Sequence, residues 1–163
     1  MRRMRVDVQR VVDATPEKVY ALLSDYRDGH LRILPGANFR DVALEAGGSG
    51  AGTILRYRSV AGRGERRYRM LVSEPEPGRV LRESSTTSSL VTTFTVSPVD
   101  GGKRSRVQIS TEIDAYPGLL GLAQRALCPS AMRGIYRKEL RLLATVMRQT
   151  TDDRPQTMRK LQT

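Results

Sequence analysis

The feature that most constrains this chain is a run of six segments between residues 39 and 115 in which apolar and polar residues alternate. A period of two is that of a β-strand with one buried face. The connections are short and rich in turn-forming residues, which favours antiparallel neighbours. We therefore predict an antiparallel meander. Its strands are FRDVALEA (39–46), TILRYRSV (53–60), ERRYRMLVSE (65–74), RVLRESS (79–85), LVTTFTVSPV (90–99) and RVQISTEIDA (106–115).

A strand and a short helix are expected before the meander. RVDVQRVV (5–12) has the rhythm of a strand, and Thr15-Pro16 is a good helix start, with an N-cap residue followed by a proline at the first helical position. The helix is predicted to end between Ser24 and Tyr26. The next residues, RDGHLRILPG (27–36), predict a second short helix or a loop. The apolar residues of the first helix recur at helical spacing: Val19, Leu22, Leu23 and Tyr26.

A long helix is predicted after Gly118, where the apolar spacing becomes helical again. Pro129 lacks a backbone donor and should kink the helix or split it near Leu127–Cys128. From about residue 150 the chain is polar and aperiodic. We therefore predict a single domain over residues 1–149 and a flexible tail over 150–163.

These elements predict an α+β fold, because a sheet with one apolar face must cover it and only the C-terminal helix is large enough. The first strand should pair with the last. The expected result is a curved seven-stranded antiparallel sheet that grips a long C-terminal helix, with two short helices between strands one and two.

Composition limits the cellular compartment and the kinds of partner that are expected. The single cysteine, Cys128, excludes an intrachain disulfide and indicates a reducing compartment. No apolar stretch follows the basic start MRRMRVDV, and no apolar run approaches the ~20 residues of a membrane span, so a soluble cytoplasmic protein is expected. The net charge of +11 is compatible either with a polyanionic partner or with an arginine-rich composition alone.

The element order resembles the helix-grip fold of the START-like (SRPBCC) superfamily, which includes polyketide cyclase/dehydrase-like proteins. This resemblance implies a cavity for a hydrophobic small molecule between sheet and long helix. Some members of the superfamily cyclise polyketides, and others carry lipids, quinones or hormones. The segments that carry the resemblance are VDATPEKVYALLSDY (12–26), DGHLRILPG (28–36), GGSGAGTILRYRS (47–59), YRMLVSEPEPGRVLRES (68–84) and GIYRKELRLL (134–143).

Alternation along the strands assigns an inward face that is mostly apolar with a few polar groups, which suits either a ligand cavity or an ordinary filled core. Glu83 is its one carboxylate. It would need a proton or a charge partner, for which Arg66 is the candidate, unless the position tilts into water. The predicted cavity residues are Leu55, Tyr57, Tyr68, Met70, Glu83, Thr92, Phe94, Ile109 and Thr111.

His30 is the only histidine, and it lies in a segment expected to form a lid with Leu31 and Leu34. It is either a proton shuttle, with Glu83 as the other candidate catalytic group, or a surface histidine. His30 and Cys128 with scattered acids form no recognisable metal-ligand spacing, and no phosphate loop or nucleophile motif is present. No cofactor and no metal are expected.

A basic patch is predicted on the outward face of one hairpin, at Arg56, Arg58, Arg67 and Arg69, opposed only by Glu65. Such a cluster is either a solvated face or a contact for an anionic partner.

Three functions follow. The leading one is a cofactor-free carrier or sensor of a small hydrophobic molecule. The second is a metal-independent polyketide aromatase/cyclase using His30 and Glu83. The third is a quinone-related or ribosome-associated interaction protein, for which nucleic acid or an anionic membrane would be the partner of the basic patch; it is the least favoured. The oligomeric state stays open.

Overall fold

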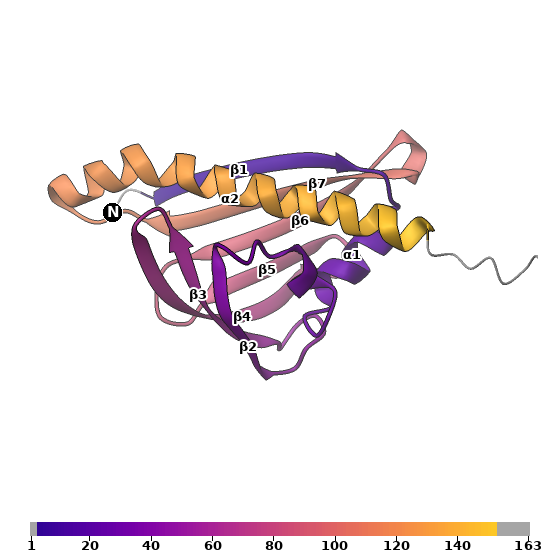
Figure 1. Cartoon of the computed structure of the whole chain (residues 1–163), viewed down its shortest axis with the longest axis horizontal. Coiled ribbons are helices and arrows are strands. Elements are labelled where there is room, and N and C mark those ends of the chain that lie inside the picture. The colour runs from indigo at the N-terminus through magenta and orange to yellow at the C-terminus, as the bar shows by residue number, and fades with distance from the viewer. Residues whose placement is uncertain (1–2, 153–163) are drawn as a thin grey trace, which may run out of the picture.

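The computed structural model describes residues 3–152 (Figure 1). The order of elements is the predicted one. The elements are β1 (Arg3–Val12), α1 (Pro16–Ser24), the 3-10 helix η1 (His30–Ile33), β2 (Phe39–Ala46), β3 (Ile54–Ala61), β4 (Gly64–Glu76), β5 (Val80–Ser85), β6 (Val91–Val99), the 3-10 helix η2 (Asp100–Gly102), β7 (Arg104–Asp114) and α2 (Gly118–Asp152).

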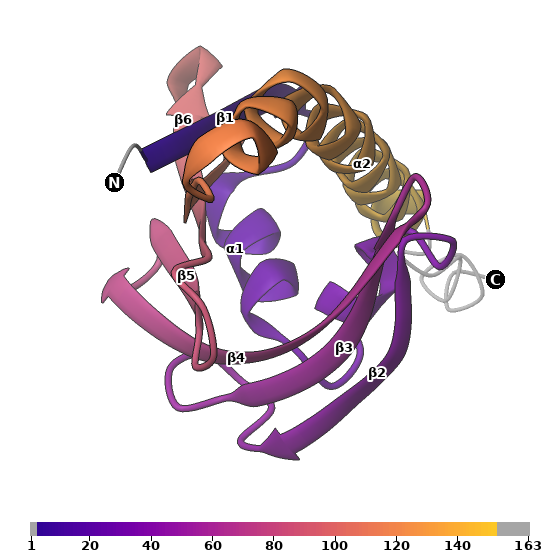
Figure 2. The ribbon, with the colours of Figure 1, turned by 90° about the vertical axis from the view of Figure 1, so that its left-hand side faces the viewer.

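All seven strands form one antiparallel sheet in the order β1-β7-β6-β5-β4-β3-β2. The first strand pairs with the last, so that Val8 lies opposite Ile109. Figure 2 shows the sheet curving around its inner face, with α2 across the open side. The predicted helix-grip fold is therefore confirmed.

The segment between β1 and η1 determines where the His30 side chain points. Thr15 is extended and Pro16 begins the helix, as the sequence predicts. After the helix, the Asp25 carboxylate accepts backbone N–H groups of Arg27 and Gly29, at 3.0 and 3.2 Å. This turn sends the chain into η1 and thereby points His30 into the molecule.

Helix α2 runs without interruption from Gly118 to Asp152, with Pro129 inside it. The prediction left open a kink or a split, and the split does not occur. In a regular helix the backbone N–H at position 129 would donate to the carbonyl of Arg125, and proline has no such N–H. Arg125 lies on the exposed side of the helix, where water can replace the lost donor. The predicted tail begins within the helix, and its remainder (153–163) lies outside the described residues.

The core lies between the sheet and the second half of α2. Ile135, Tyr136, Leu140 and Leu143 of the helix are buried there, whereas the first half of the helix is largely exposed. The sheet follows the predicted alternation, with Leu55 and Met70 buried and Arg56, Arg67 and Arg69 exposed.

Candidate functional site

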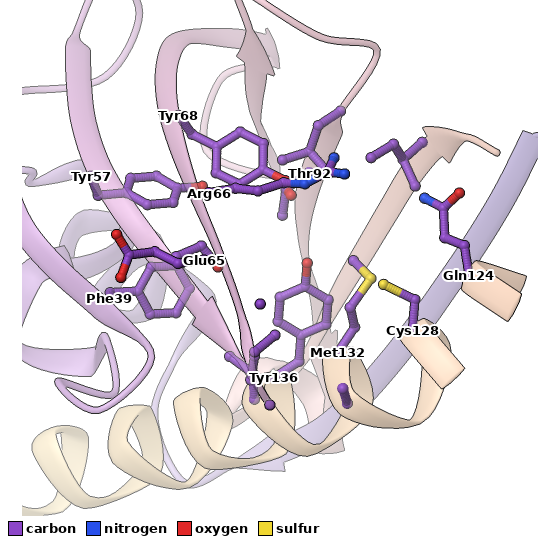
Figure 3. Close-up of a pocket in the computed structure, with 18 of the residues that line it drawn as sticks. Phe39, Tyr57, Glu65, Arg66, Tyr68, Thr92, Gln124, Cys128, Met132 and Tyr136 are labelled. Atoms are coloured by element: carbon purple, nitrogen blue, oxygen red, sulfur yellow. The ribbon is translucent and has the colours of Figure 1, made fainter. Parts of the chain in front are cut away.

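A cavity of about 830 Å³ lies between the inner face of the sheet and α2. Figure 3 shows Met132 and Tyr136 of α2 facing Tyr57 and Tyr68 of the strands across it. The lining is mostly apolar, with polar groups gathered at the buried end and at the mouth. Its main lining residues are His30, Leu34, Phe39, Leu55, Tyr57, Arg66, Tyr68, Glu83, Leu90, Thr92, Phe94, Ile113, Tyr116, Leu120, Gln124, Leu127, Cys128, Met132, Ile135, Tyr136 and Glu139.

His30 is held rigidly at the buried end of this cavity. The side chain is only 1% exposed, so it is not a surface histidine. Its Nδ1 donates to the Leu23 carbonyl at 2.6 Å, because a carbonyl can only accept. The ring stacks on Tyr26, with centroids 4.5 Å apart, and meets Phe94 edge-on at 5.2 Å.

Glu83 faces His30 and is buried with it. Its Oε1 accepts the Tyr26 hydroxyl at 2.7 Å and lies 3.6 Å from His30 Nε2. Because His30 Nδ1 already carries a proton, a neutral ring would turn the lone pair of Nε2 toward this oxygen. A proton on either Nε2 or Oε1 would remove the repulsion between the two lone pairs.

Glu139 of α2 adds a second carboxyl to the buried end. It is 2% exposed, and its Oε1 has no hydrogen-bond partner within the described part of the chain. Burial first, and then the charge of Glu83, raise the pKa of Glu139 well above its usual value. Glu139 therefore holds its proton more strongly than an exposed carboxyl does, and in the protonated form it offers a hydroxyl donor and an acceptor to the cavity.

Hydroxyl groups line the β6–β7 wall beside these carboxyls. The Thr111 hydroxyl is linked to the Tyr136 hydroxyl at 2.6 Å and to the Thr92 hydroxyl at 2.9 Å. Burial raises the pKa of Tyr136 and of Tyr57 above the usual range, so both phenols stay protonated. The wall thus presents neutral donors and acceptors rather than charges.

The mouth of the cavity lies between the β3–β4 turn and the first half of α2. Arg66 donates to the Tyr116 hydroxyl and places its guanidinium 5.1 Å from the centre of that ring. The suggestion that Arg66 pairs with Glu83 is therefore wrong, because stacking on Tyr116 holds the guanidinium at the rim.

The predicted cavity residues divide into two groups. Those on the cavity surface are Leu55, Tyr57, Tyr68, Glu83, Thr92 and Phe94, together with His30 and Leu34 of the expected lid. Met70, Ile109 and Thr111 are also buried but lie outside the cavity surface, as does the half-buried Leu31. Thr111 shows the reason: Tyr136 covers it, and alternation gives the direction of a side chain without showing what lies over it.

The outward arginines are less free than the sequence suggests. Arg58 pairs with Asp41 at 2.8 Å and Glu65 at 3.1 Å, and Arg69 pairs with Glu45 at 2.6 Å. The statement that only Glu65 opposes this patch is wrong, because β2 lies beside β3 and brings its own acids. Arg56 and Arg67 remain exposed.

Sequence reasoning missed Glu139 and the role of Tyr136, and it treated Tyr26 only as an apolar helix position. A signal existed for Glu139: it lies three residues after Tyr136 and four before Leu143, on the buried helix face. A carboxylate in such a stripe is expensive unless it has a role or a proton.

Within residues 3–152 no three His, Cys, Asp or Glu side chains lie close enough to share a metal ion. None of the helices in this range combines the length and the apolar character needed to cross a bilayer.

Residues 3–148 match the sequence model of the family described as polyketide cyclase / dehydrase and lipid transport. A comparison with curated protein sequences finds no match. Among solved structures, the KanY protein superimposes with a TM-score of 0.79 at 26% identity, over 91% of this chain and 99% of that one. The family match confirms the predicted relation to polyketide cyclase/dehydrase-like proteins, and the two structures described next confirm the shared fold.

Both of these structures share the fold at low identity. The Zhui aromatase/cyclase from Streptomyces sp. R1128 has a TM-score of 0.71 at 13% identity, covering 92% of this chain and 96% of that one. A START superfamily protein from Mycobacterium smegmatis has a TM-score of 0.67 at 13% identity, covering 90% and 98%. At these identities the likeness shows the fold alone.

Proposed function

Because this chain belongs to the family described as polyketide cyclase / dehydrase and lipid transport, we propose that it binds a small, largely apolar molecule with one polar end. The observation that carries the proposal is the cavity itself. At about 830 Å³ it lies in the range of small-molecule sites, and it opens to the surface beside α2. A filled core would have left no such space.

The distribution of polar groups indicates how the ligand lies. Its polar end is placed among Glu139, Glu83 and the Tyr136 hydroxyl, and its apolar body against Leu55, Phe94 and the α2 side chains. A protonated Glu139 both donates and accepts, so it suits a carbonyl or a hydroxyl of the ligand. A phosphate or carboxylate ligand fits poorly, since it would add negative charge beside Glu83.

The test uses two variants of one strand. Thr92→Trp places an indole in the cavity, whereas Thr93→Trp makes the same change on the opposite face of β6. Native mass spectrometry of the purified protein is expected to show a bound small molecule in the wild type and in Thr93→Trp, and none in Thr92→Trp. Circular dichroism checks that both variants fold. Retention of the same bound molecule by a folded Thr92→Trp protein would contradict the proposal.

A second function, cyclisation of a poly-β-ketone, is favoured by one observation. His30 Nε2 and Glu83 Oε1 lie 3.6 Å apart, and both side chains are buried at the inner end of the cavity. Such a pair can remove a proton from a carbon between two carbonyls and return it after the ring has closed. Phenolic and carboxyl donors nearby would stabilise the enolate oxygen.

The test of this function is turnover of a poly-β-ketone analogue. Replacement of both groups, His30→Gln with Glu83→Gln, is expected to abolish cyclisation while binding of the analogue, followed by calorimetry, persists. Undiminished turnover in the folded double variant would exclude these residues from the chemistry.

A further inference from the structure

Five of the eight large apolar side chains exposed in the described residues fall between positions 116 and 127. They belong to the start of α2 and the turn before it. Leu119, Leu120 and Leu127 are 85%, 76% and 73% exposed, which is unusual for leucine on an ordinary surface. Figure 1 shows the first turns of α2 projecting beyond the ends of the strands, in agreement with the exposure of these leucines.

The rest of the helix surface is basic. Between Gly118 and Thr150, Glu139 is the only acidic residue, and it is buried. The basic residues in the same stretch are Arg125, Arg133, Arg137, Lys138, Arg141 and Arg148. The spacing of 3.6 residues per turn places Arg137, Lys138 and Arg141 on the same side as Leu119, Leu120 and Leu127. One face of α2 therefore carries leucines at one end and uncompensated cations along the remainder.

We propose that this face of α2 docks on an anionic lipid bilayer, with the leucines in the acyl boundary and the basic residues among the headgroups. Apolar side chains beside lysine and arginine are what a helix lying in the membrane interface requires. A second copy of the chain is a poorer occupant, because a symmetric contact would bring the same cations together. Nucleic acid would satisfy the cations and leave the leucines in water.

The docked orientation places the cavity mouth at the bilayer. Leu120 and Leu127 belong both to the exposed face and to the cavity lining, and Arg66 stacks on Tyr116 at the same rim. An apolar molecule leaving the membrane would thus meet the mouth without crossing bulk water. The docking itself does not depend on the ligand proposed above, since the leucines and cations lie on the protein surface.

The first experiment is co-sedimentation of the full-length protein with vesicles of phosphatidylcholine, with and without phosphatidylserine. Binding is expected only with phosphatidylserine, and added salt should weaken it as the charges are screened. Two pairs of variants identify the surface. Leu119→Gln with Leu127→Gln removes two of the exposed leucines of this face, and Leu44→Gln with Leu71→Gln is the control pair on the sheet.

The helix leucine pair is expected to lower binding at least about tenfold, whereas the sheet pair leaves it unchanged. The charge variants lose three cations each. Removing those of α2 is expected to lower binding about a hundredfold, and removing those of the sheet has little effect. The changes are Arg137→Gln, Lys138→Gln and Arg141→Gln on α2, against Arg56→Gln, Arg67→Gln and Arg82→Gln on the sheet.

Several results would overturn the proposal. If the variant with both helix leucines replaced bound vesicles as strongly as the wild type, the leucines would not insert into the bilayer. Equal losses in both charge variants would show a non-specific effect of net charge. A dimer in sedimentation velocity that the leucine pair dissociates would show that a second copy covers this face. Failure to find a cavity ligand would leave the docking result intact.

Discussion

At the scale of residues, the buried end of the cavity is defined by how few charges it holds. The Glu83 carboxylate accepts the Tyr26 hydroxyl and lies beside His30, whereas burial and the Glu83 charge oppose the ionisation of Glu139 and raise its pKa. A fully ionised pair of carboxylates here would be costly. The arrangement thus keeps two carboxyl groups next to an apolar cavity, one of them beside the His30 ring.

Replacing Glu139 by glutamine should change the pH dependence of stability. The carboxyl has a raised pKa in the folded state and about 4.5 when unfolded, so its stabilising contribution is complete below pH 4.5 and declines as the pH rises through the folded-state value. Glu139→Gln has no such titration. Denaturant unfolding at a series of pH values should therefore show that the variant gains stability relative to the wild type as pH rises. Parallel curves for the two proteins would contradict the raised pKa.

At the scale of elements, the two halves of α2 have different structural roles. The second half closes the core through Ile135, Tyr136 and Leu140, and the first half forms one side of the cavity mouth. The first half is anchored at its start, where the Tyr116 backbone N–H donates to Gln124 Oε1 at 2.9 Å. Few apolar contacts hold it otherwise, which allows the mouth to adjust independently of the core.

A substitution at Gly121 tests whether the close packing of the first turns of α2 against Tyr116 contributes to stability. A Cβ at Gly121 would overlap the carbonyl oxygen of Tyr116, so Gly121→Ala must displace the first turns of α2. Gly134→Ala is the matched control, because nothing lies near its Cβ position and alanine favours the helix by up to about 1 kcal/mol. Thermal unfolding is expected to show a lower midpoint for Gly121→Ala and an equal or higher one for Gly134→Ala. A Gly121→Ala protein as stable as the wild type would show that the close approach of Gly121 to the Tyr116 carbonyl does not contribute to stability.

At the scale of the whole molecule, stability is distributed unevenly around the cavity. Strand β7 is paired on both sides and buries alternate residues along its length, whereas β2 is an edge strand with two irregularities in its pairing. The first half of α2 projects from the body (Figure 1). The cavity wall formed by β6 and β7 is therefore the rigid side, and the wall formed by the α2 start is the yielding one.

Amide hydrogen exchange followed by mass spectrometry should reproduce this distribution. Exchange is expected to be slowest in β7 and β6 and fastest in β2 and in residues 118–131, because local opening is cheapest where little apolar surface is buried. Bound ligand should slow exchange in residues 118–131 more than in β7. Uniform protection along α2 would contradict the division of the helix into two halves.

Features that depend on residues close together in the sequence could be predicted, whereas those that depend on contacts between distant elements could not. Residue spacing over a few positions determined the strands, the helix start at Thr15-Pro16 and the inward direction of Tyr57, Glu83 and Phe94. These depend on backbone periodicity, which is local. The meander order determined the sheet, since short connections leave few alternatives.

Only the tertiary structure decided what those inward side chains meet. It brought Glu139 of α2 toward Glu83 of β5, placed His30 beside the same carboxylate, and turned Arg66 to Tyr116 instead. It also separated the cavity lining from the filled core, where Met70 and Ile109 lie. The physical reason is that the curvature of the sheet and the position of α2 set the distances between elements, and these distances depend on packing over the whole chain rather than on any short stretch of it.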